Sequence, residues 1–131
     1  MITVDSSAVV ALLDQRERHH MEAIAILRRE RTRLLPSAAL GEIGHFIETR
    51  LGHLTLLSFI DDLIEGAYRV DGGFEDYLRV RELVERYADL PLGLVDAAVI
   101  ARAERNGGRV LTYDYRHFGV VAGEGTITIV Q

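Results

Sequence analysis

Two hydrophobic patterns alternate along the chain. Short apolar runs rich in β-branched residues, typical of buried strands, are separated by longer stretches in which apolar residues recur every three or four positions, as in amphipathic helices. The strand-like runs are 1–4, 33–36, 67–70, 109–114 and 126–130. The helix-like stretches are 6–14, 19–32, 38–52, 53–66, 74–88 and 94–108. This alternation predicts an α/β fold in which helices cover both faces of a parallel five-stranded sheet.

Local signals place several boundaries of these elements. A hydroxyl at Ser6 or Ser7 is a candidate N-cap of the first helix, and Ser37 is a candidate N-cap of the helix after the second strand. Pro91 interrupts the chain before the last long helix, and Gly107 is expected to end that helix. The hydroxyl of Ser6 would still point toward the carboxyl end of the first strand, where a ligand could bind.

Helical spacing also predicts which side chains turn inward. On 74–88 the expected apolar stripe consists of Tyr77, Val80, Val84 and Tyr87. The stretch 54–64, "LTLLSFIDDLI", is more apolar than a small core needs. We therefore expect a protein interface on that helix, and a homodimer or a hetero-oligomer as its product.

Length and composition limit the class of protein. The 131 residues suit one domain, 1–131, that is long enough to bury a core without covalent staples. The chain has no cysteine, which removes disulfides and thiolate metal sites and favours a reducing compartment. Its start lacks the pattern of a signal peptide, and no apolar run approaches the ~20 residues of a membrane span. A cytoplasmic protein without membrane contact is expected.

Charge narrows the partners. The net charge of −5 argues against a protein that coats duplex DNA through many phosphate contacts. A nucleic-acid substrate would therefore need a local binding site. All fifteen basic residues are arginine, which genome composition explains as well as any function does.

Four acids occupy positions that this fold would bring together. Asp5 follows the first strand and Asp114 ends the fourth, and these strands are neighbours if the sheet order is 3-2-1-4-5. Glu42 lies about a turn into the helix after the second strand, and Asp96 lies near the start of the helix before the fourth. Helices that follow parallel strands begin at the same edge of the sheet, so all four carboxylates can converge.

The spacing of two of these acids suggests that they face inward. Asp96 falls four residues after Leu92 and three before Val99, inside the apolar stripe, and Glu42 is similarly placed among apolar residues. Each acid alone is equally well explained by the stabilisation of negative charge at a helix N-terminus. Together, however, the four would repel one another unless a cation lay between them. Oxygen ligands of this kind suit Mg²⁺ or Mn²⁺ and hydrolysis of a phosphodiester bond.

The motifs around these acids are similar to those of a known family. "VDSSAVVALL", "PSAALGEIGHFIETR", "YADLPLGLVDAAVIARAERNGGRVLTYD" and "YRHF" resemble the PIN-domain ribonucleases, in particular the VapC-type toxins of toxin–antitoxin pairs. The resemblance extends from the first strand to the last. It implies a three-layer fold with sheet order 3-2-1-4-5 and a Mg²⁺- or Mn²⁺-dependent endoribonuclease that cleaves RNA and is silenced by a cognate antitoxin.

The resemblance also assigns residues. It implies that the family's catalytic and metal-binding acids are Asp5, Glu42, Asp96 and Asp114. The family often has hydroxyls after the first acid and two residues before the last, and Ser6 and Thr112 match those positions as supporting residues. Family members commonly have a basic or small residue where this chain has Tyr113. This departure is expected to alter RNA contacts and to leave the chemistry intact.

Other chemistry-bearing residues have weaker claims. His117 could hold a phosphate or donate a proton, but no nucleophile accompanies it, and a peripheral place is expected. His19 and His20 are adjacent on a helix and diverge, so a histidine metal site is not expected. A phosphotransferase with an aspartyl intermediate would need a second acid at position 7, where Ser7 stands, and a receiver domain would need a lysine.

One further alternative stays open. A catalytically degenerate PIN-like binding module would share the fold and lack the chemistry. The presence of all four acids favours an enzyme over that module.

Overall fold

The computed structural model describes residues 1–131 and contains one parallel sheet of five strands in the order β3-β2-β1-β4-β5. The strands are β1 (Ile2–Val4), β2 (Arg33–Pro36), β3 (Arg69–Asp71), β4 (Arg109–Leu111) and β5 (Thr128–Ile129). The α-helices are α1 (Ser6–Leu13), α2 (His20–Arg29), α3 (Leu40–Phe46), α4 (His53–Ile64), α5 (Tyr77–Arg86), α6 (Leu94–Arg105) and α7 (Tyr115–Ala122). The predicted fold class and strand order are confirmed.

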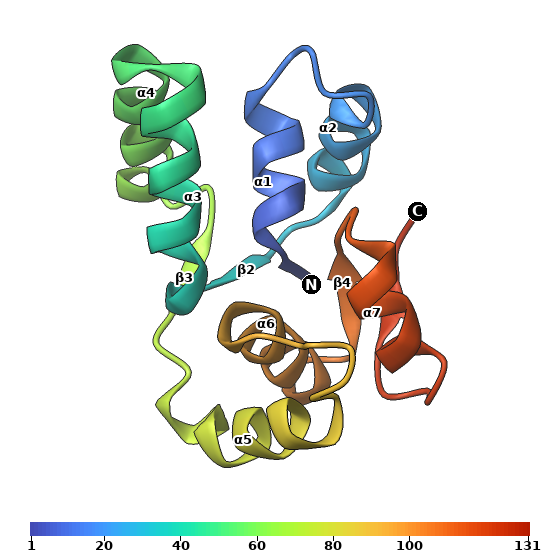
Figure 1. Cartoon of the computed structure of the whole chain (residues 1–131). Coiled ribbons are helices and arrows are strands. Elements are labelled where there is room, and N and C mark those ends of the chain that lie inside the picture. The colour runs from blue at the N-terminus through green and yellow to red at the C-terminus, as the bar shows by residue number, and fades with distance from the viewer.

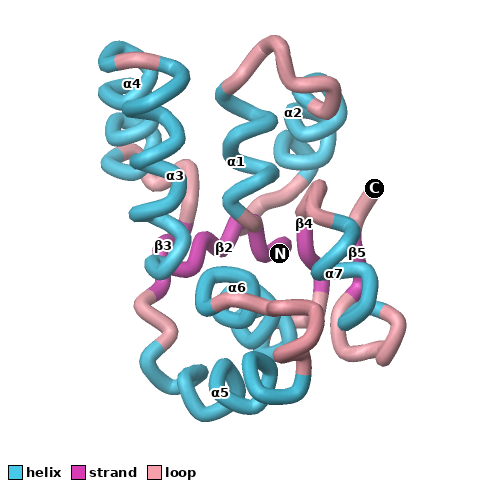
Figure 2. Tube along the Cα trace, in the orientation of Figure 1, coloured by secondary structure: helices cyan, strands magenta, loops and turns pink.

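Helices cover both faces of this sheet. In Figure 1, α1 to α4 lie above the strands, and α5 and α6 lie below them. Figure 2 shows the strands as a single magenta row between these two layers. Each layer has its own core, because one cluster of buried residues joins α5, α6 and α7 and a second joins α1 to α4. The architecture is therefore a three-layer sandwich.

Neighbouring residues of one strand serve opposite cores. Val110 of β4 belongs to the cluster of α5, α6 and α7, whereas the next residue, Leu111, belongs to the cluster of α1 to α4. Both side chains are fully buried. This is the behaviour of a parallel strand covered on two sides, and it explains why such strands read as continuous apolar runs.

The helix α7 was not predicted from the sequence. Only Phe118 and Val121 of its eight residues are fully buried, and Gly119 in its interior lowers helix propensity. Asp114 begins this helix as its N-cap by accepting a hydrogen bond from the backbone N–H of His117. The fourth strand correspondingly ends at Leu111, three residues before its predicted end.

The predicted N-caps were wrong. Asp5 caps α1, with extended backbone and a side chain that accepts from the N–H of Ser7 at 3.4 Å, so Ser6 is already the first helical residue. Asp is as good an N-cap as Ser, and the strand that precedes it sets the required backbone conformation. Ser37 begins a short 3₁₀ turn, Ser37–Ala39, that has no side-chain cap.

Two further helical expectations need correction. The inward face of α5 consists of Val80 and Leu83, followed by Tyr87, whereas Tyr77 and Val84 are exposed. The long helix expected at 38–52 is α3 followed by a π-helical turn, Ile47–Leu51.

No helix combines the length and apolar character that crossing a bilayer would require. The interface predicted on α4 stays a prediction, although four of its large apolar side chains are exposed, namely Leu54, Leu57, Ile60 and Ile64.

Two glycines connect α6 tightly to β4. Gly107 and Gly108 have φ values of 93° and 78°, in the left-handed region that other residues rarely adopt. A Cβ atom at Gly108 would lie 3.0 Å from the carbonyl oxygen of Thr126. The predicted end of this helix at the glycine pair is correct to within two residues, and the turn fixes α6 relative to β4.

Candidate active site

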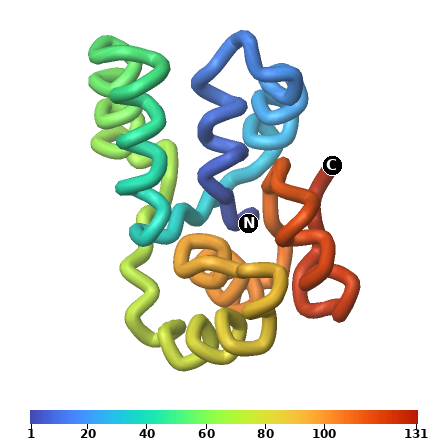
Figure 3. Tube along the Cα trace, viewed as in Figure 1, coloured from blue at the N-terminus to red at the C-terminus, as the bar shows by residue number.

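The first and last of the predicted acids lie at the ends of adjacent strands. Asp5 follows β1 directly, and Asp114 follows β4 by three residues. Val4 and Leu111 are paired in the sheet, and the backbone N–H of Asp5 donates to the carbonyl of Leu111 at 3.0 Å. Figure 3 shows the blue start of the chain next to the orange strand that precedes α7. The sheet therefore joins two acids that are far apart in the sequence.

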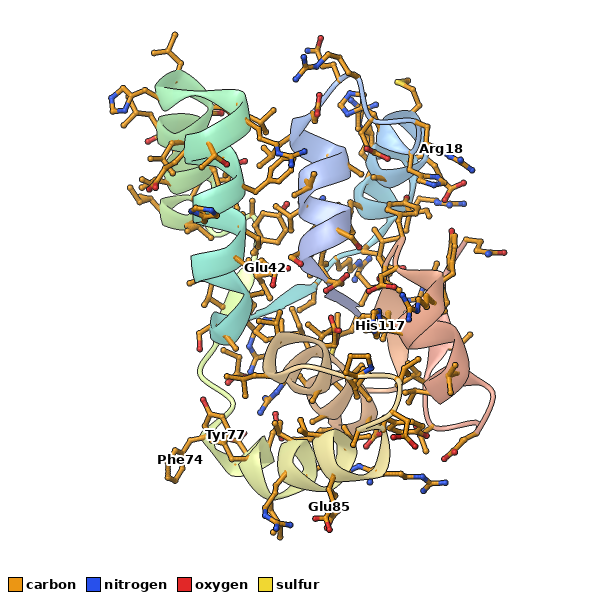
Figure 4. All side chains as sticks on the ribbon, viewed as in Figure 1. Arg18, Glu42, Phe74, Tyr77, Glu85 and His117 are labelled. Atoms are coloured by element: carbon orange, nitrogen blue, oxygen red, sulfur yellow. The ribbon has the colours of Figure 1, made fainter.

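A cleft of about 400 Å³ opens at this edge of the sheet. All four predicted acids line it, and the full lining is Asp5, Ser6, Ser7, Val10, Glu17, Glu42, Phe46, Asp96, Tyr113 and Asp114. Figure 4 shows Glu42 on α3 and His117 on α7 at two sides of the end of β1. No arginine is among the lining residues, so their negative charges are not neutralised from within the cleft.

Asp5 is the most buried of the four acids. One of its carboxylate oxygens, Oδ2, accepts hydrogen bonds from the hydroxyls of Ser7 at 2.6 Å and Thr112 at 2.9 Å. The other, Oδ1, is buried and has no hydrogen-bond partner. Burial raises the pKa of Asp5 above its usual value even though these hydrogen bonds oppose the shift. One carboxylate oxygen of Asp5 thus has hydrogen-bond partners, and the other is left without one and could bind a ligand.

Asp96 lies half-buried in the first turn of α6. Burial raises its pKa to about 6, and the negative charges of Asp5 and Asp114 add to the shift, with a smaller contribution from Glu42. All three neighbours come from other segments of the chain. His117 opposes the shift, whereas the nearby carboxylates repel one another in the absence of a cation.

Glu42 reaches the cleft from a different direction than its spacing suggested. It is exposed, and the inward face of its helix is formed instead by Ala39, Ile43 and Ile47. The hydroxyl of Ser6 donates a hydrogen bond to the Glu42 carboxylate. Ser6 therefore orients this acid rather than capping its own helix.

Asp114 has two roles. It caps α7, and it also lines the cleft. His117 lies against it, with the ring Nδ1 at 2.8 Å and 3.1 Å from its two carboxylate oxygens. Ligand atoms of Asp96, Asp114 and His117 all lie within 4.8 Å of one another. His117 is therefore nearer to the acids than the sequence suggested.

Two hydroxyls orient the acids at the strand ends. Thr112 donates to Asp5 and accepts from the backbone N–H of Asp114 at 3.1 Å, so it touches both strand-end acids. Ser7 donates to Asp5 and accepts from the backbone N–H of Tyr113 at 3.0 Å. The sequence analysis did not select Ser7 for the site. Its position, two residues after the first acid and in the first turn of a helix, was the only signal that could have marked it.

This donor set fits a hard divalent cation. The cleft is lined by the four predicted acids and by Glu17, which the sequence did not mark. It also contains a buried Asp5 oxygen that lacks a partner, and no arginine is among its lining residues. Mg²⁺ and Mn²⁺ prefer such oxygen ligands, whereas the absence of cysteine excludes thiolate coordination. The arrangement is suited to chemistry on a phosphate group.

Comparisons with known proteins agree with this geometry. The family model of the PIN domain matches residues 2–124. Ribonuclease VapC26 of Mycobacterium tuberculosis is 28% identical over 132 residues, which cover 97% of this chain and 98% of that protein.

Solved structures show the same fold. The crystal structure of VapC20 from Mycobacterium tuberculosis, a toxin that cleaves the sarcin–ricin loop, superimposes with a TM-score of 0.80 at 20% identity, covering 92% of this chain and 95% of that one. VapBC2 of Rickettsia felis, bound to a DNA fragment from its promoter, gives 0.73 at 13% identity, covering 99% and 98%. With the family model matching nearly the whole chain and the acids gathered at the expected edge of the sheet, this protein belongs to the PIN domain family.

Proposed function

We propose that this protein is an endoribonuclease that hydrolyses phosphodiester bonds of RNA with Mg²⁺ or Mn²⁺, and that it is the toxin of a toxin–antitoxin pair. The observation that carries the proposal is the convergence of four carboxylates on one cleft without an internal cation. The similarity to a ribonuclease and to a toxin that cleaves RNA supports the choice of substrate. A toxin of this kind acts where cellular RNA is, so we expect it in the cytoplasm.

Asp5, Asp96 and Asp114, with Glu42, are the residues that would hold the cation, and His117 stands beside them. When bound, a divalent cation neutralises the carboxylates, lowers the pKa of a water molecule and stabilises negative charge on the phosphate. The protein contributes orientation. Thr112 and Ser7 fix one oxygen of Asp5, Ser6 fixes Glu42, and His117 fixes Asp114.

Such preorganisation matters because a catalytic group must be held in place before the reaction begins. The hydrogen bonds to Asp5 all reach Oδ2, which leaves Oδ1 as its free ligand atom. Removing a hydroxyl that orients an acid should therefore weaken activity without removing any charge. Thr112→Val is the cleanest such change because it keeps the shape of the side chain.

An antitoxin could silence the enzyme through the same cleft. The guanidinium group of an arginine binds carboxylates through two parallel hydrogen bonds and would replace the missing positive charge. The VapBC2 complex of Rickettsia felis and FitAcB of Neisseria gonorrhoeae are solved relatives in fold. Co-expression with the gene next to this one should yield a stable complex with low nuclease activity. Full nuclease activity in that complex would contradict inhibition by the antitoxin.

The competing function is a degenerate PIN-like module that binds a partner and cleaves nothing. The presence of all four acids in the cleft favours the enzyme, since these are the acids that the resemblance to the family assigns to metal binding and catalysis. A cleavage assay separates the two functions directly.

The test is the substitution Asp96→Asn. It keeps the shape of the side chain and removes one negative charge from the cation's surroundings, so cleavage of a panel of structured RNAs in Mg²⁺ or Mn²⁺ should fall by about 100-fold or more, equal to ~2.7 kcal/mol. Circular dichroism verifies that the variant is folded. Asp89→Asn, at an exposed acid outside the cleft, is the matched control. Activity of Asp96→Asn within about threefold of the wild type would sink the assignment.

A further inference from the structure

Three aromatic rings form a cluster at the border of the acidic cleft. His19, at the start of α2, stacks on Tyr113, with ring centroids 4.1 Å apart and ring planes 5° from parallel. Tyr115 meets both rings nearly at right angles, at 6.5 Å from His19 and 6.4 Å from Tyr113. We call these three residues the aromatic cluster. It joins the loop after α1 to the segment between β4 and α7.

The aromatic cluster is fixed relative to the carboxylates. Tyr113 lies in the chain between Thr112, which binds Asp5, and Asp114, which lines the cleft. Its backbone N–H donates to the hydroxyl of Ser7, which also binds Asp5. Tyr113 is itself a lining residue of the cleft. Any group packed on this cluster would therefore lie at the border of the acidic cleft.

A purely structural role explains only part of this cluster. The stack of His19 on Tyr113 fastens the loop after α1, and that contact needs no third ring. Tyr115 nevertheless keeps 41% of its surface exposed. The cluster is thus a partly exposed aromatic surface beside a strongly negative cleft.

We propose that the aromatic cluster is a stacking platform for an unpaired nucleobase of the RNA next to the scissile phosphate. This inference rests on the proposed function. Aromatic side chains bind bases through their faces, and this attraction requires no positive charge, which the cleft lacks. A base inside a duplex is covered on both faces by its neighbours. The platform therefore selects single-stranded loops or bulges over continuous helices.

The test measures binding separately from cleavage. The Asp96→Asn variant, which cannot cleave efficiently, is titrated with short single-stranded RNAs that carry the fluorescent base 2-aminopurine at each position in turn. Stacking should quench the fluorescence at one position near the cleavage site that the wild type uses. Tyr115→Ala in the same background should abolish that quenching and weaken binding, measured by fluorescence anisotropy, by roughly 5- to 100-fold. Tyr115→Phe, which keeps the ring, should restore most of the affinity.

An abasic RNA supplies the second arm of the experiment. Removing the base at the quenched position should weaken binding to the protein that keeps Tyr115. The loss should equal the loss that Tyr115→Ala causes with intact RNA. Replacing Tyr115 should then cost the abasic RNA nothing more. Tyr77→Ala is the matched control, because this tyrosine of α5 is 46% exposed and meets the ring of Phe74 edge-on at 5.9 Å. Figure 4 shows Tyr77 at the lower left, beside α5, and His117 near the centre of the molecule.

The outcomes separate the platform from the nuclease proposal. Cleavage by the wild type and its loss in Asp96→Asn would support the nuclease. If Tyr115→Ala in the Asp96→Asn background then binds intact and abasic RNA as tightly as Asp96→Asn alone does, the platform is wrong and the nuclease proposal still holds. An equal loss in Tyr77→Ala would also overturn the platform, because the effect would not belong to the cleft. Absence of RNA binding and of cleavage by the wild type would overturn both.

Discussion

Acidic side chains gather at both ends of α6, but only those at its C-terminal end are paired with arginines. At its N-terminal end, Asp96 faces three other carboxylates across a cleft with no arginine in its lining. At its C-terminal end, Arg102 donates hydrogen bonds to three acids at 2.7 to 2.8 Å, namely Asp71, Glu75 and Asp76. Arg105 binds Asp76 as well, at 2.6 Å. One helix therefore joins a group of unpaired acids to a group of paired ones.

The difference shows how a functional acid can be recognised. Arg102 and Asp76 are both almost fully buried, and each neutralises the other inside the fold. That cluster is complete without any ligand, and its effect is to connect α6 with the segment between β3 and α5. The acids around Asp96 have no arginine partner in the cleft, so a cation from outside the protein is needed to balance their charge. Unpaired charge, and not charge alone, is what supports the proposed metal site around Asp96.

The largest effect on stability is expected from breaking the paired cluster. Asp76→Asn removes the buried partner of Arg102 and leaves that guanidinium with only the partly exposed Asp71 and Glu75. We expect the free energy of unfolding in denaturant to fall by about 2 to 4 kcal/mol. Cleavage per folded molecule should be retained. Loss of activity at unchanged stability would contradict the division between the two ends of α6.

The next effect concerns the unpaired cluster, which a cation should stabilise. Mn²⁺ that binds the folded state alone raises the free energy of unfolding by about 2.7 kcal/mol at a hundredfold excess over its dissociation constant. Thermal melting in EDTA and in Mn²⁺ measures this gain. The gain should shrink in Asp96→Asn and persist in Asp89→Asn. An identical melting temperature in saturating Mn²⁺ would count heavily against a clustered metal site.

A smaller effect follows from the pH dependence of the metal-free protein. Because the pKa of Asp96 is raised to about 6 in the folded state, folding keeps a proton that the unfolded chain has already released. The free energy of unfolding should therefore decrease as pH rises from about 4, the ordinary pKa of an Asp side chain, to about 6, and the raised pKa of Asp5 acts in the same direction. After allowance for solvent screening at this half-exposed group, the decrease due to Asp96 is roughly 1 kcal/mol.

Denaturant unfolding in EDTA between about pH 4 and pH 7 measures this change. Glu30 and Glu75 have pKa values lowered mainly by hydrogen bonds from arginines, so their contributions arise at lower pH and have the opposite sign. Asp96→Asn should flatten the profile, and Mn²⁺ should flatten it in the wild type. A profile that is equally steep in Asp96→Asn would assign the effect to other groups.

The smallest effect is expected where acid and base are paired but exposed. Glu85 and Arg81 form an ion pair of 2.7 Å one turn apart on α5, with side chains 70% and 77% exposed. Figure 4 shows Glu85 on the outer side of that helix. Glu85→Gln should change the free energy of unfolding by less than about 0.5 kcal/mol. A loss as large as that of Asp76→Asn would show that pairing alone, without burial, sets the strength of these contacts.

The sequence by itself determined the framework and the position of the acids within it. Alternating strand and helix patterns predict a parallel sheet, and in such a sheet the residues that follow the strands share one edge. Asp5 and Asp114 could therefore be placed together from their positions after strands, and Glu42 and Asp96 from their positions early in helices. The resemblance to the PIN domain family singled out the same four residues.

Only the tertiary structure decided which side chains touch those acids and how. Ser6 meets Glu42 across 36 residues, and Thr112 meets Asp5 across 107, distances along the chain at which no local pattern carries information. The helix α7 formed despite weak local signals, because Phe118 and Val121 pack into the core below the sheet. Its formation turns Asp114 into a cap and brings His117 against it. Hydrogen-bond partners depend on how whole segments pack, so their identity appears only when the layers are assembled.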